Sequence, residues 1–91
     1  MDEARLEAEL ERTFAASEGE RRAVVRAARD LADSGRLTAD RGEPPAVDAL
    51  VAELRDAPEG SSLAERWNWW LGALEIAYDG GYTEFQVRRY D

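Results

Sequence analysis

"RWNWWLGALEIAY", residues 66–78, contains all three tryptophans of this 91-residue chain within four positions. On a helical wheel, with about 100° per residue, one broad face of this segment is apolar. We expect this face to form the core of the fold. Its predicted members are Trp67, Trp70, Leu71, Leu74 and Tyr78, together with Leu63 and Ala77 near the two ends of the helix.

Three further apolar side chains, Trp69, Ala73 and Ile76, fall on the opposite side of the same predicted helix. A helix that is apolar on two sides is either covered by its own domain or buries its second face in a partner. Trp69 is therefore a candidate interface residue, since tryptophan is enriched at interaction hot spots. The alternative is that the first helix or the C-terminal residues cover Trp69 within one chain.

Two further helices are predicted in the first part of the chain. Residues 2–16 begin with Asp2, a good N-cap residue, and have a narrow apolar stripe on an otherwise charged segment. Residues 18–34 follow a capping-box pattern, in which Ser17 precedes Glu20 by three positions, and they end before a glycine. Both segments are long enough to cover one face of the tryptophan helix.

The second half of the chain contains two more helical segments, separated by proline and glycine. Residues 45–57 have apolar side chains at helical spacing between Pro45 and Pro58. The tryptophan helix itself is expected over residues 63–79. Ser62 and the glutamate three positions later form its capping box, and a glycine pair ends it.

The C-terminal residues 82–90 differ from the rest of the chain. Thr83, Phe85 and Val87 alternate with polar residues, which predicts one short strand. A single strand needs a partner for its backbone groups. Residues 35–39 could supply one within the chain, or the segment could be an irregular packed tail. Exchange of the tail with a second subunit is the remaining alternative.

The composition indicates an adaptation to salt. The chain has twenty acidic and twelve basic residues, all twelve of them arginine, and a net charge of −8. A dense carboxylate surface stays hydrated in concentrated salt, which also screens its self-repulsion. Together with the block RWNWWLGALEIAYDGGY, this composition resembles the small acidic proteins of haloarchaea. That resemblance implies a cytoplasmic location at high salt and says nothing about activity or mechanism. A GC-rich genome is the alternative reason for the arginine and alanine content.

Several classes of function are disfavoured by what the chain lacks. Without cysteine or histidine there is no disulfide, no thiolate or imidazole metal site and no histidine base. The serines fit helix ends, where their hydroxyls act as caps. The first four residues do not form an apolar leader, and no run reaches membrane length. We expect a protein that is not exported, does not contact membranes, has no cofactor or metal, and is not an enzyme.

The basic residues form two small groups. Arg22, Arg26 and Arg29 share one face of the predicted helix 18–34, but Glu18, Asp30 and Asp33 each lie four positions from one of them. This spacing is typical of a solvated face with ion pairs along the helix. Arg88 and Arg89 form the other group. The net charge argues against general nucleic-acid binding, which requires a basic footprint.

We therefore predict an all-α fold of three to four helices in a bundle-like domain, with a short extended C-terminal segment. The predicted function is a non-enzymatic, salt-adapted protein–protein interaction module that forms a homodimer. Its expected interface residues are Trp69, Ala73, Ile76, Phe85 and Tyr90. The alternative is a small nucleic-acid-associated or regulatory helical protein that uses the arginines of either basic group.

Folding should depend on salt if this interpretation is correct. In dilute buffer, repulsion among the carboxylates is unscreened, and a core of this size offers little stability to offset it. Circular dichroism over a KCl titration should show helicity and melting temperature rising with salt. Full helicity together with an unchanged melting temperature in dilute buffer would contradict the salt-adaptation hypothesis.

Overall fold

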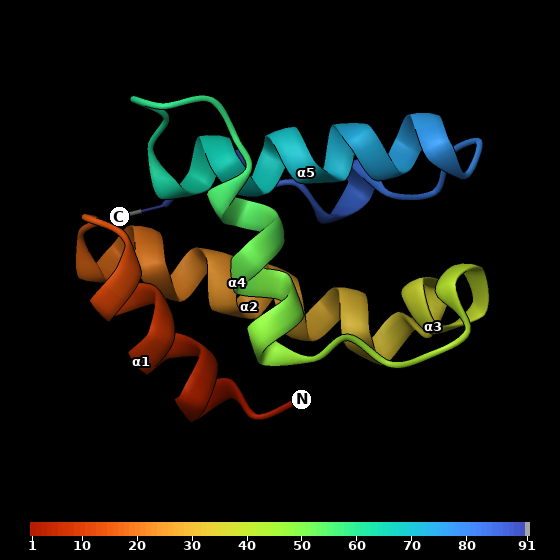
Figure 1. Cartoon of the computed structure of the whole chain (residues 1–91), viewed down its shortest axis with the longest axis horizontal. Helices are drawn as coiled ribbons and strands as arrows, with labels where there is room; N and C mark the ends of the chain where they lie inside the picture. Colours follow the sequence, from red (N-terminus) through yellow and green to blue (C-terminus); the bar gives the residue numbers. More distant parts are fainter. Residues whose placement is uncertain (91) are drawn as a thin grey trace.

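The computed structural model describes residues 1–90, which contain five α-helices, one 3₁₀ turn and no β-strand (Figure 1). The elements are α1 (Glu3–Thr13), α2 (Glu18–Ser34), α3 (Arg36–Arg41), α4 (Val47–Arg55), α5 (Leu63–Ala77) and η1 (Thr83–Phe85). The prediction of an all-α fold is confirmed. Each of the four long helices begins and ends within a few residues of its expected bounds.

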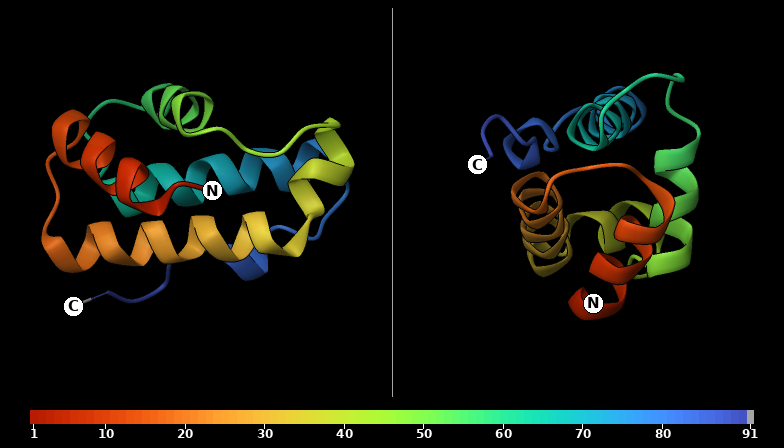
Figure 2. Two further views of the ribbon diagram at one scale, coloured as in Figure 1. Left: turned by 90° about the horizontal axis from the view of Figure 1, so that it is seen from below. Right: turned by 90° about the vertical axis from the view of Figure 1, so that its left-hand side faces the viewer.

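The two longest helices, α2 and α5, lie side by side and run in the same direction (Figures 1 and 2). Helix α4 crosses them on one side, and α1 packs against both α2 and α4. The tail that follows α5 lies on the other side of the α2–α5 pair, as the right-hand view of Figure 2 shows. Its 3₁₀ turn contacts α2 and α5. The tryptophan helix is therefore packed between α4 and the tail.

One contiguous core fills the space between these elements. The helical stripes supply its aliphatic part, and α5 supplies two tryptophans whose rings meet edge to face, with centroids 5.5 Å apart. The buried members from α5 are Leu63, Ala64, Trp67, Trp70, Leu71 and Leu74, and those from the other helices are Leu6, Leu10, Val24, Val25, Ala28, Leu31, Leu37, Val47, Leu50, Val51 and Leu54. Beyond the last helix, Tyr82 and Val87 join the same core.

The start of α5 is held from two directions. The capping box predicted at Ser62 is confirmed: the Ser62 hydroxyl accepts from the Glu65 amide, and the Glu65 carboxylate accepts from the Ser62 amide, 2.7 Å away. The hydrogen bond from the Ser62 backbone, followed by the Ser62 side chain, lowers the pKa of Glu65. The second contact comes from α2, where the predicted capping box of Ser17 and Glu20 is only half formed. The Ser17 hydroxyl accepts from the Glu20 amide, but the Glu20 carboxylate accepts from the Ala64 amide at 2.8 Å instead of from Ser17. Glu20 is the one buried acid in residues 1–90, and the positive end of the α5 dipole favours it there.

The connector between α2 and α4 differs from expectation. Residues 35–39 are not a strand partner, because α3 forms immediately after α2. Gly35 adopts a left-handed conformation, with φ of 73°, which ends α2 and turns the chain. Leu37 then enters the core, so a short helix is stabilised where the sequence predicted only a connector.

The prediction of a C-terminal strand is wrong. Thr83–Phe85 forms a 3₁₀ turn, and the chain becomes extended only from Gln86. The alternation of Thr83, Phe85 and Val87 arises because the last two pack against the core, without a neighbouring strand in residues 1–90. Side chains of α5 satisfy backbone groups of the tail instead.

Candidate functional site

The side chain of Asn68 pairs with the backbone of the tail. Its Nδ2 group donates to the Val87 carbonyl at 2.8 Å, and its Oδ1 atom accepts from the Val87 amide at 2.8 Å. A single carboxamide thus makes the two hydrogen bonds that a neighbouring strand would make with one residue. The Val87 side chain is buried in the core beside this contact. Asn68 therefore substitutes for the strand partner that the sequence pattern called for.

Trp67 makes the second contact of this kind. Its indole Nε1 donates to the carbonyl of Phe85 at 2.8 Å, while its ring is fully buried. A buried indole N–H normally has a partner, and here the tail provides it. In contrast, the indole nitrogen of Trp70 is buried and has no partner among residues 1–90. We call the contacts of Trp67 and Asn68 with residues 85–87 the tail clamp.

The path from α5 into the tail is fixed by glutamate and glycine. Asp79, Gly80 and Gly81 all have positive φ, so the chain reverses in three residues. After the turn, the Glu75 carboxylate accepts from the amides of Tyr82 at 2.9 Å and Thr83 at 3.2 Å. The tail is therefore connected to α5 at both ends of η1.

Tyr82 anchors the tail to α3. Its ring is fully buried, and its hydroxyl donates to the Asp40 carboxylate at 2.5 Å. Burial, followed by this hydrogen bond and the charge of Asp40, raises the pKa of Tyr82 above its ordinary value of 10.0. The neutral phenol is thus the form that the fold stabilises.

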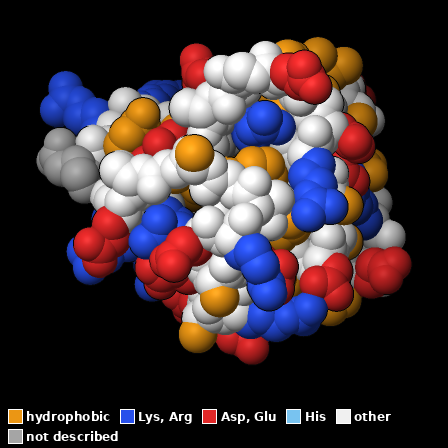
Figure 3. Space-filling view, turned by 60° about the vertical axis from the view of Figure 1, so that its left-hand side comes forward, with side chains coloured by type: hydrophobic (Ala, Val, Ile, Leu, Met, Phe, Trp, Pro, Cys, Tyr) orange, Lys and Arg blue, Asp and Glu red, His pale blue; other side chains and the backbone are white. Residues whose placement is uncertain are grey.

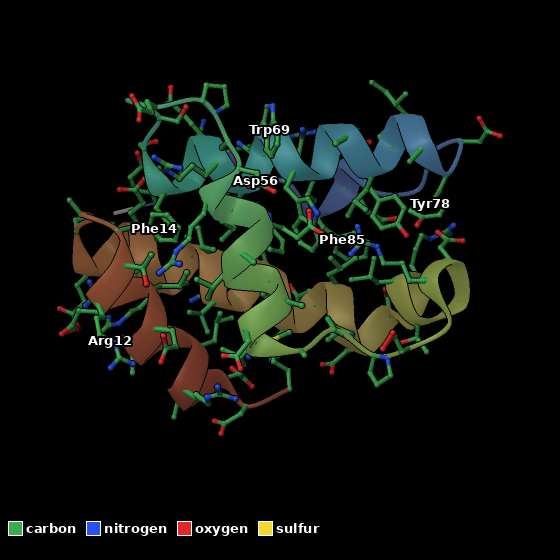
Figure 4. All side chains as sticks on the ribbon, viewed as in Figure 1. Arg12, Phe14, Asp56, Trp69, Tyr78 and Phe85 are labelled. Atoms are coloured by element: carbon green, nitrogen blue, oxygen red, sulfur yellow. The ribbon has the colours of Figure 1, made fainter. Side chains whose placement is uncertain are left out.

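The opposite side of α5 is open to solvent. Trp69 is 42% exposed and Ile76 is 83% exposed, and Ala73 between them is exposed as well. Figure 4 shows Trp69 projecting from the side of α5 that faces away from α2, whereas Phe85 lies between the two helices. Within residues 1–90, neither α1 nor the tail buries Trp69. We call Trp69, Ala73 and Ile76 the outer face of α5.

Several positions differ from expectation. Ala77, assigned to the core face, is exposed at the end of α5, whereas Tyr78 is half-buried and packs against the core. Phe85, a predicted interface residue, also packs against the core of its own chain. Tyr90 is exposed, at 44%. Among the predicted interface residues, Phe85 is therefore the one whose side chain is partly buried within its own chain.

The arginines of α2 do not act as one group. The expected pair of Arg22 with Glu18 is present at 2.5 Å, but Arg29 pairs with Glu3 at 3.9 Å and Asp30 at 3.4 Å instead of Asp33. Arg26 forms no ion pair with the described residues. It lies instead beside the tail, where it lines a shared cavity with Arg88 and Arg89. The structure thus joins part of one predicted basic group to the other.

Most of the chain, including the tryptophan segment, matches a known family. Residues 1–75 match the family model described as the WNWW domain, and residues 67–70 of this chain read Trp-Asn-Trp-Trp. The chain belongs to the WNWW-domain family. No curated protein and no solved structure matches it.

In this WNWW domain, the four residues of the motif have separate positions. Trp67 and Trp70 pack in the core, Asn68 holds the tail, and Trp69 points to solvent. The family match ends at residue 75, before the tail that the motif contacts. Sequence reasoning missed Asn68 and Glu75, although a carboxamide between tryptophans was a signal that a polar group had a partner inside the fold.

Other kinds of site are not visible in the described residues. No group of three or more acidic side chains in residues 1–90 gathers closely enough to hold a metal ion. None of the helices found there has the length and apolar character needed to cross a membrane. Acidic and basic side chains are interspersed on the face drawn in Figure 3. Two features remain as candidates. They are the outer face of α5 and the arginines that line cavities between α2 and the tail, which are Arg22, Arg26, Arg88 and Arg89.

The Tyr82–Asp40 contact makes stability depend on pH at the alkaline end. The unfolded chain loses the Tyr82 proton near the ordinary pKa of 10.0, whereas the folded chain keeps it. The contribution is therefore complete below about pH 10 and is lost as the pH rises above it. Denaturant unfolding of the protein and of Tyr82→Phe at about pH 9 and about pH 11 should show a smaller difference in unfolding free energy at the higher pH. A difference that stays constant or grows would contradict the assignment.

Proposed function

We propose that this WNWW domain is a non-enzymatic interaction module that forms a homodimer through the outer face of α5. The observation that supports it most is the exposure of Trp69 and Ile76 on one side of a helix whose other side is already in the core. Single exposed apolar residues are common, but a stripe of a tryptophan and an isoleucine around small residues is an apolar patch. A partner that covers it would remove this patch from water.

The pattern of the outer face is self-complementary. Trp69 lies four residues before Ala73, and Ile76 lies three residues after it. If two copies of α5 cross antiparallel with the two-fold axis near Ala73, Trp69 of each copy faces Ile76 of the other. Gly72 and Ala73 leave a low profile at the crossing point, which allows the helices to approach closely. Such an isologous contact is the usual interface of a symmetric dimer.

The charge distribution supports a dimer that forms at high salt. No charged residue lies within the outer face, and the acids that flank it are Glu65 and Asp79. Between two copies these acids repel each other in dilute buffer, and salt screens the repulsion. Apolar burial is maintained or strengthened by salting-out conditions. Salt adaptation and a cytoplasmic location at high salt, as the composition suggests, are parts of the same proposal.

The alternative function, contact with nucleic acid, has less support. Arg29 is engaged by Glu3 and Asp30, so the three arginines of α2 do not form one free row. A net charge of −8 opposes an approach to a long phosphate backbone. Arg26, Arg88 and Arg89 line one cavity, but Asp30 and Glu84 line it as well, so it presents no continuous basic surface to a duplex.

The dimer can be tested by light scattering in concentrated KCl with the variant Trp69→Glu. We expect the protein to be a dimer and the variant to be a folded monomer, because a charge placed against Ile76 of the other copy is costly to bury. Ala8→Glu, which adds the same charge at an exposed position of α1, should leave the dimer intact. Ile76→Glu should also give a monomer. Because the Ile76 side chain is highly exposed in the single chain, this substitution should not disturb folding, so a monomer would report the loss of the interface.

Two results would count against the proposal. A protein that stays monomeric at every concentration and salt level would refute the homodimer. Dimers that persist in both Trp69→Glu and Ile76→Glu would place the interface elsewhere on the chain.

A further inference from the structure

A small cavity lies between α2 and the end of the tail, with a volume of about 310 Å³. Its lining comes from two segments that are far apart in the sequence. The residues are Gly19, Arg22, Ala23 and Arg26 from α2, and Arg89 and Tyr90 from the tail. None of them is acidic, although the chain contains twenty acids.

Two small residues of α2 line this cavity. Gly19 and Ala23 are four positions apart, so they lie one above the other on the same side of the helix. Ala27, one turn further on, lines an adjoining cavity of about 190 Å³ beneath the tail. Arg22 and Arg26 of α2 line the same cavity, so small and cationic side chains alternate along this side of the helix.

The arginines at this place have few partners. Arg26 and Arg89 form no ion pair with any residue from 1 to 90, and Arg22 is held only by Glu18, in an exposed pair. Asp30 and Glu84 line the adjoining cavity together with Arg26, Arg88 and Arg89, so that cavity carries both signs of charge. The residues that line the cavity over Gly19 include no acid, although Glu18 beside it pairs with Arg22. Arg26 and Arg89 have no such pair in residues 1–90, and a bound anion would offset the repulsion between their charges.

We propose that the cavity formed by Arg22, Arg26, Arg89 and Tyr90 binds a small phosphate-bearing anion. The guanidinium group presents its N–H donors in a planar fork that matches two oxygens of a phosphate, and each such bond is charge-assisted. Tyr90 also lines the cavity, and its side chain carries a hydroxyl donor. A carboxylate would engage one fork, whereas the oxygens of a phosphate can engage arginines on both sides of the cavity.

The small number of arginines at this place favours a free small molecule over a polymer. A volume of about 310 Å³ accommodates a phosphate and a small attached group. Nucleic acid would need additional cations along its backbone, and the next arginine of α2, Arg29, is engaged by acids. This site is on the tail side of the molecule and does not depend on the proposed dimer.

Asn68 positions the tail side of this cavity. It holds the backbone of Val87 through two hydrogen bonds, and Arg89 and Tyr90 follow two and three residues later. Asn68 does not line the cavity itself. Loss of the Asn68 carboxamide should therefore weaken anion binding through the tail, without removing any of the three arginines.

The test is a titration with inorganic phosphate, monitored by NMR of the arginine Nε–Hε groups at constant ionic strength and at the lowest KCl concentration that keeps the protein folded. We expect saturable shifts of Arg22, Arg26 and Arg89. The double variant Arg26→Gln and Arg89→Gln should weaken binding at least about tenfold, since each lost bond joins two charged groups. Arg55→Gln removes an exposed arginine of α4 without an ion pair in residues 1–90 and should leave binding unchanged.

Asn68→Ala distinguishes the positioning role from a general loss of structure. We expect weaker phosphate binding while the core resonances of Val24 and Leu31 keep their positions, and Asn68→Gln should not restore it, because its side chain is one methylene longer. Shifts that do not saturate, or that spread over all arginines including Arg55, would overturn the proposal. Binding of a single-stranded oligonucleotide with no saturable binding of phosphate would also overturn it and would favour a nucleic-acid surface.

Discussion

The pairing of the Asn68 carboxamide with the Val87 backbone is the constraint on which the arrangement of the second half of the molecule depends. An extended segment without a neighbouring strand would leave its amide and carbonyl groups unpaired against an apolar surface, which is costly. Asn68 satisfies both groups of Val87, and Trp67 satisfies the Phe85 carbonyl. Because the tail is held there, Val87 can enter the core, and Arg89 comes to lie beside α2.

The same helix explains why the three tryptophans occur together. Residues 67 and 70 are three positions apart and face the core, residue 68 faces the tail, and residue 69 faces solvent. One turn of α5 thus contacts the core, the tail and the surroundings of the molecule. A helix placed between α4 and the tail has one free side, and Trp69 occupies it. Three of the four residues of the Trp-Asn-Trp-Trp motif therefore hold this chain together, and the fourth, Trp69, is exposed to solvent.

Much of the fold was predictable from periodicity, and the exceptions have physical causes. The stripes of α2 and α4 and the core face of α5 follow from apolar spacing alone, because burial of one face is what makes an amphipathic helix stable. Helix α3 was missed because it buries one large apolar side chain, Leu37, and its stability comes from tertiary packing. The tail was misassigned because the alternation of Thr83, Phe85 and Val87 does not reveal that residues 83–85 form a 3₁₀ turn, which places Phe85 and Val87 against the core without a strand. Neither Asn68 as a backbone partner nor the meeting of Arg26 with Arg89 could be foreseen, since both require the fold.

The central claim is that Asn68 holds the tail through the Val87 backbone, and hydrogen exchange at the Val87 amide tests it most directly. In the folded protein this amide should be protected to a degree similar to the amides of α5, although Val87 belongs to no helix or strand. In Asn68→Ala the protection of Val87 should be lost, while the amides of Val24 and Leu31 in α2 remain protected. A Val87 amide that exchanges in the unmodified protein as fast as one in an unstructured chain would contradict the account.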